Sequence, residues 1–136
     1  MEREDKELLL KDLCARLPYG VKAKYYGSAE ECECCDTIEG IYPMDDEIVI
    51  GQYGLSVDMI KPYLFPLSSM TEEQKKEYNR WKHEVPVCHY EYGDVVEEVE
   101  LFDSPESFEY LIENHFDYRG LIPKGLANDA TGLNIY

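Results

Sequence analysis

Apolar residues recur with helical spacing at the start of the chain and predict an amphipathic helix over residues 4–17. The stripe at positions i, i+3, i+4 and i+7 consists of Leu10, Leu13, Cys14 and Leu17, with Leu9 beside it. The other face carries charged residues, including Asp12 and Arg16, which we expect to be solvated. Pro18 and Gly20 follow and end the helix.

Residues 21–57 change to short extended runs, which predict a β-rich segment. Residues 21–26 alternate polar and apolar side chains, and residues 32–38, 47–50 and 53–57 form further runs separated by glycines. Pro62 and Pro66 then bracket three apolar residues, which we expect to be an ordered connector because proline is excluded from a helix interior. Several short strands in so few residues favour a small antiparallel β-sheet or an SH3-like barrel.

Two later helices are indicated by their N-terminal residues. Thr71 and Gln74 have the spacing of a capping box and begin a helix over residues 71–82. Ser104 followed by Pro105 begins a helix over residues 105–114. The expected buried stripe of that last helix is Phe108, Leu111 and Ile112. We expect His115 to end this helix with a protonated ring, and the remaining tail to be irregular. The fold class is therefore α+β, in one domain over residues 1–136.

A β-hairpin is predicted over residues 85–101, between these two helices. Its strands alternate on either side of Gly93 and Asp94, a pair typical of a two-residue turn. The apolar residues expected to face inward are Val95, Val99 and Leu101. Glu97 lies on the same face of the strand, which conflicts with a buried face.

The chain is strongly acidic, with 13 Lys and Arg against 29 Asp and Glu and a net charge of −16. Twenty of the acids lie in two windows without Lys or Arg, between Lys24 and Lys61 and between Lys82 and Arg119. This distribution argues against direct nucleic-acid binding and against an anionic membrane surface. Three interpretations stay open: a surface that only keeps the protein soluble, a surface directed at a basic partner by imitation of nucleic acid, and a divalent-cation site. The acidic, polar start indicates a cytoplasmic protein rather than a signal peptide.

The five cysteines do not predict disulfides, since their number is odd and no export signal precedes them. Cys32 and Cys35 have the C-x₂-C spacing of half a zinc site. The other half could come only from Cys88 with His83 or His89, and neither pair has the usual spacing. We therefore expect reduced thiols and no bound metal or cofactor. A small zinc-binding domain that uses Cys32, Cys35, Cys88 and His89 is the alternative.

The sequence contains no phosphate-binding loop, dinucleotide fingerprint, zinc-protease motif or nucleophile elbow, so we expect a protein without catalytic activity. Its twelve tyrosines suit a protein interface. Neighbouring aromatic residues that cannot all face inward are candidates for binding, namely Tyr25, Tyr26, Tyr90 and Tyr92. The alternative is that most tyrosines, Tyr25, Tyr63, Tyr78 and Tyr110 among them, fill the boundary of a small core.

Three blocks carry a resemblance that spans the chain: residues 8–21 (LLLKDLCARLPYGV), residues 60–73 (IKPYLFPLSSMTEE) and residues 115–127 (HFDYRGLIPKGLA). Together they resemble a family of small proteins encoded by gut anaerobic bacteria and their prophages or mobile elements. The resemblance implies a single domain and a phage or mobile-element accessory role, and it supplies no mechanism. Within the blocks we expect Asp117, Tyr118 and Arg119 to form a local feature, with Arg119 paired to a carboxylate.

These observations predict a non-enzymatic protein-interaction module. Its partner is expected to be another protein with a basic surface.

Overall fold

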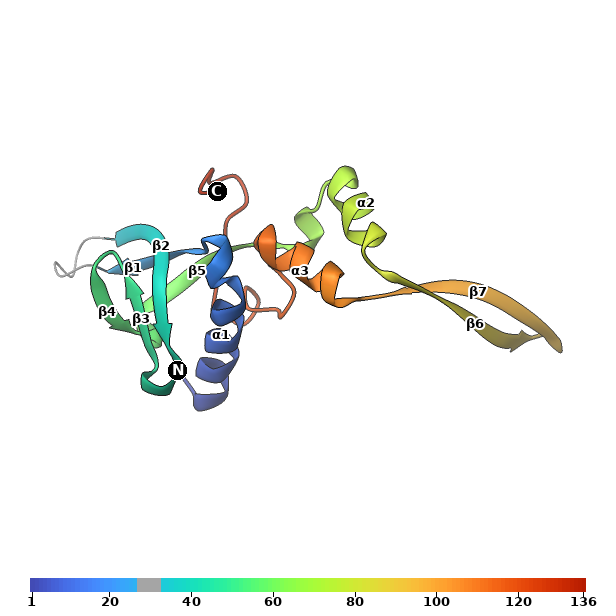
Figure 1. Cartoon of the computed structure of the whole chain (residues 1–136), viewed down its shortest axis with the longest axis horizontal. Helices are drawn as coiled ribbons and strands as arrows, with labels where there is room; N and C mark the ends of the chain where they lie inside the picture. Colours follow the sequence, from blue (N-terminus) through green and yellow to red (C-terminus); the bar gives the residue numbers. More distant parts are fainter. Residues whose placement is uncertain (27–32) are drawn as a thin grey trace. The chain divides into compact units, whose positions relative to one another are not determined.

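The structure is a computed structural model that describes residues 1–26 and 33–136, with the side chains of residues 26, 33 and 34 outside the description. The chain divides into two compact units (Figure 1). The sheet unit consists of Met1–Ser69 and Ile112–Tyr136, and the hairpin unit consists of Met70–Leu111. A single domain stays a prediction, because two compact units can still unfold together.

The sheet unit combines one helix, α1 (Arg3–Arg16), with a mixed β-sheet, which confirms the α+β class. Its strands are β1 (Lys22–Tyr26), β2 (Glu33–Tyr42), β3 (Glu47–Ile50), β4 (Tyr53–Ser56), β5 (Ile60–Pro66), β8 (Phe116–Asp117) and β9 (Asn128–Asp129). The sheet order is β4-β3-β2-β1-β5-β8, and β9 also pairs with β5. Strands β1 to β5 pair antiparallel, whereas β8 and β9 pair parallel with β5. Single 3₁₀ turns cover Leu17–Tyr19, Pro43–Asp45, Val57–Met59 and Leu67–Ser69.

The sheet is open, so the expectation of an SH3-like barrel is not met, whereas strands β1 to β5 form the expected small antiparallel sheet. In the part of the chain that the structure describes, the end strands β4 and β8 do not pair with each other. The segment predicted to be a connector is strand β5, which takes β8 and β9 from the C-terminal tail. Proline is tolerated there because consecutive residues of a strand direct their backbone groups to alternate edges, so each proline removes a donor from one edge only.

Helix α1 buries a wider face than its apolar stripe predicts. Leu9, Leu10 and Leu13 are buried as expected, whereas Cys14 is exposed. Asp12 and Arg16 are completely buried, so the expectation that they are solvated is wrong. The apolar core around α1 also includes Val21, Ala23, Ile38, Ile48, Ile50, Val57, Ile60, Leu64 and Leu121. A charged pair can share this core because its members neutralise each other, as described below.

The hairpin unit contains α2 (Glu72–Arg80), β6 (His83–Glu91), β7 (Asp94–Phe102) and most of α3 (Pro105–Glu113). The predicted capping box is present: Gln74 N donates to Thr71 Oγ1 over 3.2 Å, and Thr71 N donates to Gln74 Oε1 over 2.9 Å. Ser104 Oγ accepts from Ser107 N over 3.0 Å, as expected of a residue at the start of α3. Of the stripe predicted for α3, Leu111 is buried and Ile112 is half-buried, but Phe108 is exposed.

The hairpin turn lies one residue earlier than predicted. Glu91 pairs with Asp94, so the two loop residues are Tyr92 and Gly93. Their φ angles of +53° and +84° are those of a type I′ turn, which matches the twist of the flanking strands. Glycine supplies the second positive φ at no steric cost, and this places Gly93 second in the loop rather than first.

Candidate interaction surface

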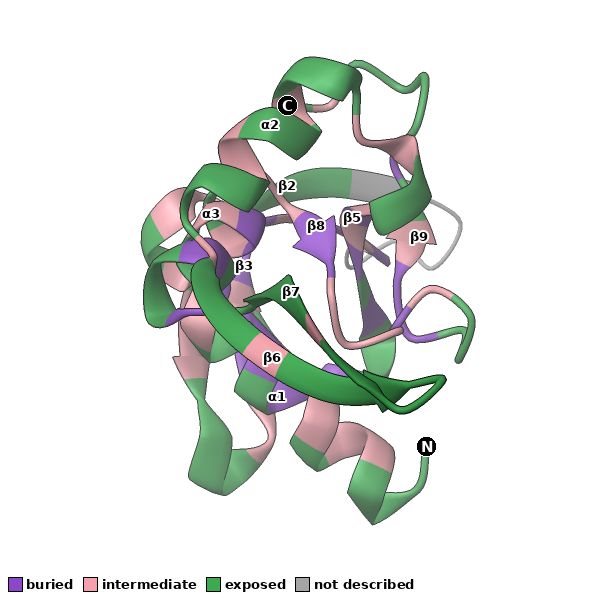
Figure 2. Ribbon diagram, turned by 90° about the vertical axis from the view of Figure 1, so that its right-hand side faces the viewer, coloured by how far each residue is buried: buried purple, intermediate pink, exposed green. Residues whose placement is uncertain are grey.

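The arm, defined as β6, β7 and their turn (residues 83–102), exposes nearly all its side chains (Figure 2). Val95, Val99 and Leu101 are 60%, 64% and 43% exposed, so the prediction that they face inward is wrong. Glu97 on the same strand face was the sequence signal for this outcome. The hairpin of the structure is thus a ribbon without a buried face, and its apolar side chains are available for contact.

The strand register divides the arm into two faces. Directly opposed residues of an antiparallel pair share a face, and successive pairs alternate between faces. We call one of them the Val99 face; it consists of Glu84, Pro86, Cys88, Tyr90, Val95, Glu97, Val99 and Leu101. The opposite face carries most of the charge, with Glu91, Asp94, Glu98 and Glu100 among its members. The Val99 face is therefore mainly apolar, whereas the opposite face holds four of the six carboxylates of the arm together with Val85, Val87, Val96 and Phe102.

The arm has six carboxylates and no Lys or Arg. Its only cationic candidates are His83 and His89, and His89 Nε2 lies 3.8 Å from Glu91 Oε2. Most of these carboxylates have no compensating charge on the arm itself, so the ribbon projects a negative potential.

Contacts inside the hairpin unit tie the two ends of the arm together. The Tyr78 hydroxyl donates to Asp103 just after β7, and the Ser104 hydroxyl donates to the carbonyl of Trp81 just before β6. Burial, followed by the hydrogen bond and charge of Asp103, raises the pKa of Tyr78 well above its usual range. The amine of Lys82 lies 4.3 Å from the centre of the Tyr78 ring. These contacts fix the base of the arm while its strands stay exposed.

The four tyrosines proposed for binding have different environments. Tyr90 and Tyr92 belong to the arm and are 82% and 99% exposed. Tyr25 is only 3% exposed, and its hydroxyl donates to Asp36 Oδ2 over 2.5 Å. Tyr25 is therefore a core residue whose ring packs over the sheet, and it is not part of the candidate surface. The side chain of Tyr26 lies outside the described residues.

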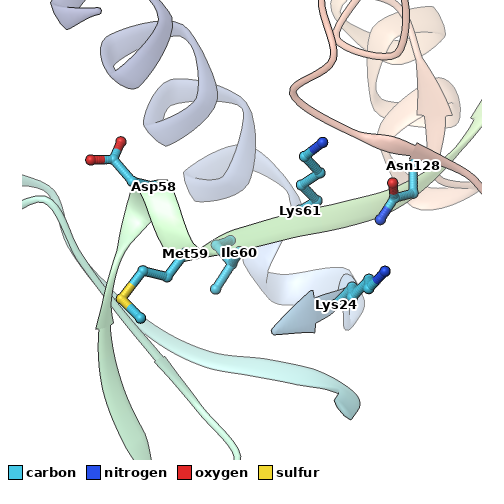
Figure 3. A pocket seen from close by; sticks show the side chains of 6 residues that line it. All are labelled: Lys24, Asp58, Met59, Ile60, Lys61 and Asn128. Carbon is cyan, nitrogen blue, oxygen red and sulfur yellow. The ribbon is translucent and has the colours of Figure 1, made fainter. Parts of the chain in front are cut away.

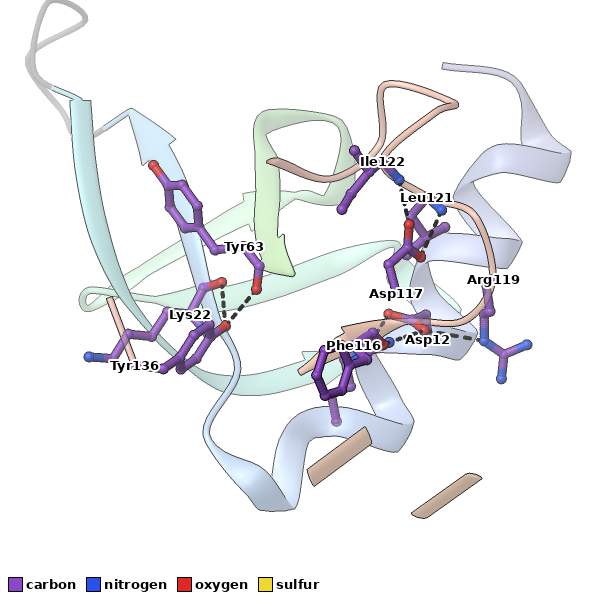
Figure 4. Close-up of polar contacts among 10 residues, drawn as sticks. Asp12, Lys22, Tyr63, Phe116, Asp117, Arg119, Leu121, Ile122 and Tyr136 are labelled. Carbon is purple, nitrogen blue, oxygen red and sulfur yellow. Dashed lines mark hydrogen bonds and ion pairs between the residues drawn. The ribbon is translucent and has the colours of Figure 1, made fainter. Parts of the chain in front are cut away.

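Asp117 holds a turn of the C-terminal tail in the sheet unit (Figure 4). Its carboxylate is buried and accepts from the backbone N–H groups of Leu121 and Ile122, both over 2.9 Å. A carboxylate that caps two backbone donors is already satisfied. Asp117 therefore shapes the tail, and nothing in its environment favours contact with a ligand.

Arg119 pairs with a carboxylate, as the sequence predicts, and that carboxylate is the buried Asp12 of α1 (Figure 4). The contact joins Arg119 Nε to Asp12 Oδ1 over 3.3 Å and is not bidentate. Arg16 Nε donates to Asp12 Oδ2 over 2.7 Å, and Arg16 Nη2 donates to the carbonyl of Phe116 over 2.6 Å. Tyr118 lies beside both guanidinium groups, and burial raises its pKa. This cluster connects the tail to α1.

Tyr136 is fixed by backbone contacts of β1 and β5 (Figure 4). Its hydroxyl accepts from Lys22 N and donates to the carbonyl of Tyr63, both over 2.8 Å. The ring stacks on His115 with 3.6 Å between centroids. Burial, followed by the charges of Arg16 and Lys22, lowers the pKa of His115 to about 4. The protonated ring expected of His115 is therefore disfavoured, first because the ring is partly buried and second because Arg16 and Lys22 are near it.

The zinc alternative receives no support from the described residues. Cys35 and Cys88 are both exposed, and Cys32 lies outside the described residues. Burial is the main cause that raises the pKa of Cys35, which disfavours the thiolate that metals bind. His89 lies on the face of the arm opposite to Cys88. Among residues 1–26 and 33–136, no three His, Cys, Asp or Glu side chains are grouped to hold a metal.

A surface cavity of about 320 Å³ lies in the sheet unit (Figure 3). Lys24 and Lys61 oppose each other in the β1–β5 register and both line it. Asn128 adds an amide, and Asp58, which also lines the cavity, lies 3.3 Å from the amine of Lys6. The lining combines charges of both signs and supplies no Cys, His or Ser nucleophile, so its chemistry does not indicate a reaction.

No protein-family model, curated protein or solved structure matches this chain. In the described part of the chain, no helix has the length and apolar content required to cross a membrane.

Proposed function

We propose that the protein is a non-enzymatic interaction module whose arm binds a basic surface on another protein. The single observation that supports this most is the exposure of Tyr90, Val95 and Val99 on a ribbon with six carboxylates and no Lys or Arg. Protein interfaces combine a desolvated apolar and aromatic centre with complementary charge around it. The Val99 face supplies the apolar part, and the opposite face supplies the charge.

The energetics of the arm agree with this role. A two-stranded hairpin alone is only marginally stable in water. A partner that covers the arm therefore adds favourable free energy with each apolar side chain that it buries. Full burial of one Val or Leu side chain is worth about 1.5–3 kcal/mol. The acidic charge accelerates encounter with a basic surface and disfavours acidic competitors. Affinity and selectivity thus come from different faces of the same ribbon.

The resemblance to small proteins of prophages and mobile elements supplies the biological part of the proposal. An accessory protein of this kind would act in the bacterial cytoplasm on a component of the host. An inhibitor that presents acidic surface to a basic site is the form that fits the charge of this chain. The resemblance motivates this context, and the exposed arm supplies the surface for it.

The test compares two variants with the same total charge. The arm variant carries Glu97→Lys, Glu98→Lys and Glu100→Lys, and its control carries three Lys at exposed acids of the sheet unit: Glu2, Glu39 and Asp45. Each tagged protein is used to capture proteins from a host lysate at ~50 and ~500 mM salt, which separates screened charge contacts from apolar ones. Captured proteins are identified by mass spectrometry.

We expect the original chain and the control variant to capture one or a few basic proteins. The arm variant should fail to capture the same proteins. The signal should fall at ~500 mM salt without disappearing, since apolar contacts are not screened. Capture of the same proteins by the arm variant would contradict the proposal, and so would the absence of any partner at either salt. In both cases the acidity would serve solubility alone.

A further inference from the structure

The turn fixes which backbone groups of the arm point outward. In a hairpin with a two-residue loop, the pair that flanks the loop exchanges backbone hydrogen bonds, and such pairs then alternate with pairs that do not. Glu91 and Asp94 flank this loop. Counting from them, the pairs whose N–H and C=O groups point to the outer edges are Tyr90 with Val95, Cys88 with Glu97, Pro86 with Val99, and Glu84 with Leu101.

The two outer edges of the ribbon therefore differ. On β6, the outward position at residue 86 is a proline, which has no N–H to donate. On β7, all four outward positions keep their N–H and C=O groups, at Val95, Glu97, Val99 and Leu101. The structure pairs β6 and β7 only with each other among the residues it describes. The outer edge of β7 is thus a continuous row of donors and acceptors, the arrangement to which another strand can add.

We propose that the outer edge of β7 receives an extended, basic segment of the partner as a third strand. This inference rests on the proposed function and names how the arm binds and what it binds. Side chains of an added strand alternate between the two faces. On one face they lie beside Val95, Val99 and Leu101, with Glu97 between them, and on the other beside Asp94, Glu98 and Glu100, with Val96 between them. The matching segment therefore alternates apolar and Lys or Arg residues.

A second copy of this chain fits the edge poorly. If β7 paired with β7 of another copy, an acidic strand would lie against an identical acidic strand. Like charges placed opposite each other across strands destabilise the pair. The four carboxylates of β7, at positions 94, 97, 98 and 100, make the basic segment the better occupant.

The probe for this proposal is a ten-residue synthetic peptide of alternating Val and Lys. A peptide of the same composition with its Val and Lys in two blocks is the control for charge alone. Binding is measured by fluorescence anisotropy at ~50 mM salt with the full chain. The alternating peptide should bind at least tenfold more tightly than the block peptide, because only the alternating one places each residue type on the matching face of the ribbon.

Backbone pairing is tested at two directly opposed positions of the arm. Glu97→Pro removes an outward N–H from β7, and Cys88→Pro removes one from β6 at the position opposite it. Glu97→Ala removes the same side chain but keeps the N–H. We expect Glu97→Pro to weaken binding at least tenfold, Glu97→Ala two- to threefold, and Cys88→Pro less than twofold. Far-UV circular dichroism checks that each variant keeps its secondary structure.

A second measurement does not depend on how the variants fold. In antiparallel pairing the Val residues of the peptide lie opposite the outward positions of β7 and exchange backbone hydrogen bonds with them. Methylation of the Val backbone nitrogens removes these donors and should abolish binding to the unaltered protein. Equal binding of the methylated peptide, or equal affinities for Glu97→Pro and Glu97→Ala, would overturn strand addition. A dimer of the free protein in sedimentation that Glu97→Pro dissolves would assign the edge to a second copy and overturn it as well.

The two proposals fail in different ways. If the Lys triple variant loses its partner while Glu97→Pro retains it, the interaction function holds and strand addition is wrong. If the Lys triple variant retains every partner, the interaction function itself is wrong.

Discussion

The sheet unit and the hairpin unit place charged and apolar side chains in opposite ways. In the sheet unit, Asp12 and Arg16 are completely buried and hydrogen-bond to each other, and Arg16 also donates to the tail. In the hairpin unit, Val95 and Val99 are mostly exposed on a strand with several carboxylates. The sheet unit uses its charges for internal connection, whereas the hairpin unit leaves apolar surface that its own residues do not cover. The difference places the buried core mainly in the first unit and uncovered apolar surface in the second.

The largest expected effect is at the buried ion pair of the sheet unit. Arg16→Ala leaves Asp12 with the partly exposed Arg119 as its only ion-pair partner among the described residues and removes the donor to the Phe116 carbonyl. Loss of one member of a buried pair costs about 3–5 kcal/mol. Urea unfolding monitored by circular dichroism measures it. The double variant Asp12→Leu with Arg16→Met should recover most of the loss, because it removes the unpaired charge as well. A loss below about 1 kcal/mol in the single variant would show that the pair does not support the core.

Substitution of one glycine in each unit compares the stability of the two units directly, because both glycines lie in turns with a positive φ. A Cβ on Gly51, at φ +55°, would overlap the hydroxyl of Tyr25 in the core, whereas a Cβ on Gly93, at φ +84°, would meet open space. Gly51→Ala should therefore cost about 2–4 kcal/mol, from backbone strain plus overpacking. Gly93→Ala should cost about 1 kcal/mol from strain alone. Thermal unfolding of both variants checks the order, and equal losses would contradict the difference in packing.

The third prediction concerns pH and the sheet unit. Because the folded pKa of His115, about 4, lies below its usual 6.5, the unfolded chain binds a proton more readily than the folded chain. This contribution is fully present above pH 6.5 and is lost as the pH falls from 6.5 to about 4. After allowance for a half-exposed ring, we expect a loss of about 1 kcal/mol.

The control for this titration is His115→Asn. Asparagine tolerates the positive φ of +62° at this position and does not titrate. The difference in unfolding free energy between the original chain and the variant should shrink as the pH is lowered, while the many carboxylates contribute equally to both. A constant difference between pH 7 and pH 4.5 would show that His115 does not carry this dependence.

The smallest effect on stability is expected in the arm. Val99→Ser changes a side chain that is 64% exposed, so the free energy of unfolding should change by less than about 0.5 kcal/mol. The comparison is sharpened by Ile48→Ser in the sheet unit, where the residue is completely buried and the loss should be several-fold larger. A clear loss of stability from Val99→Ser would mean that the exposed face contributes to folding.

Features set by local chemistry could be predicted from the sequence. The capping box at Thr71, the N-terminal Ser104 of α3 and the extent of α1 each depend on residues a few positions apart. The hairpin was also predicted, but its turn was placed one residue late. Both orders put a glycine in the loop, and of the two turn types favoured in hairpins only type I′ takes its glycine second.

Features that depend on distant parts of the chain could not be predicted. Asp12 and Arg16 are typical surface residues by type, and their burial follows from a carbonyl and an arginine about a hundred positions away. Strand β5 was missed because its prolines argue against a central strand, and because two of its three partner strands come from the tail. For the candidate surface, Tyr90 and Tyr92 were predicted, but the exposure of Val95 and Val99 was not, because alternation alone does not show whether a face is covered.

Pro86 also limits the side on which the arm can add strands. A ribbon with two complete edges can add strands on both sides without end, which is how fibrils grow. Here the β6 edge lacks a donor at its middle, which disfavours strand addition on that side. Backbone pairing along the arm is thereby directed to one side of the ribbon.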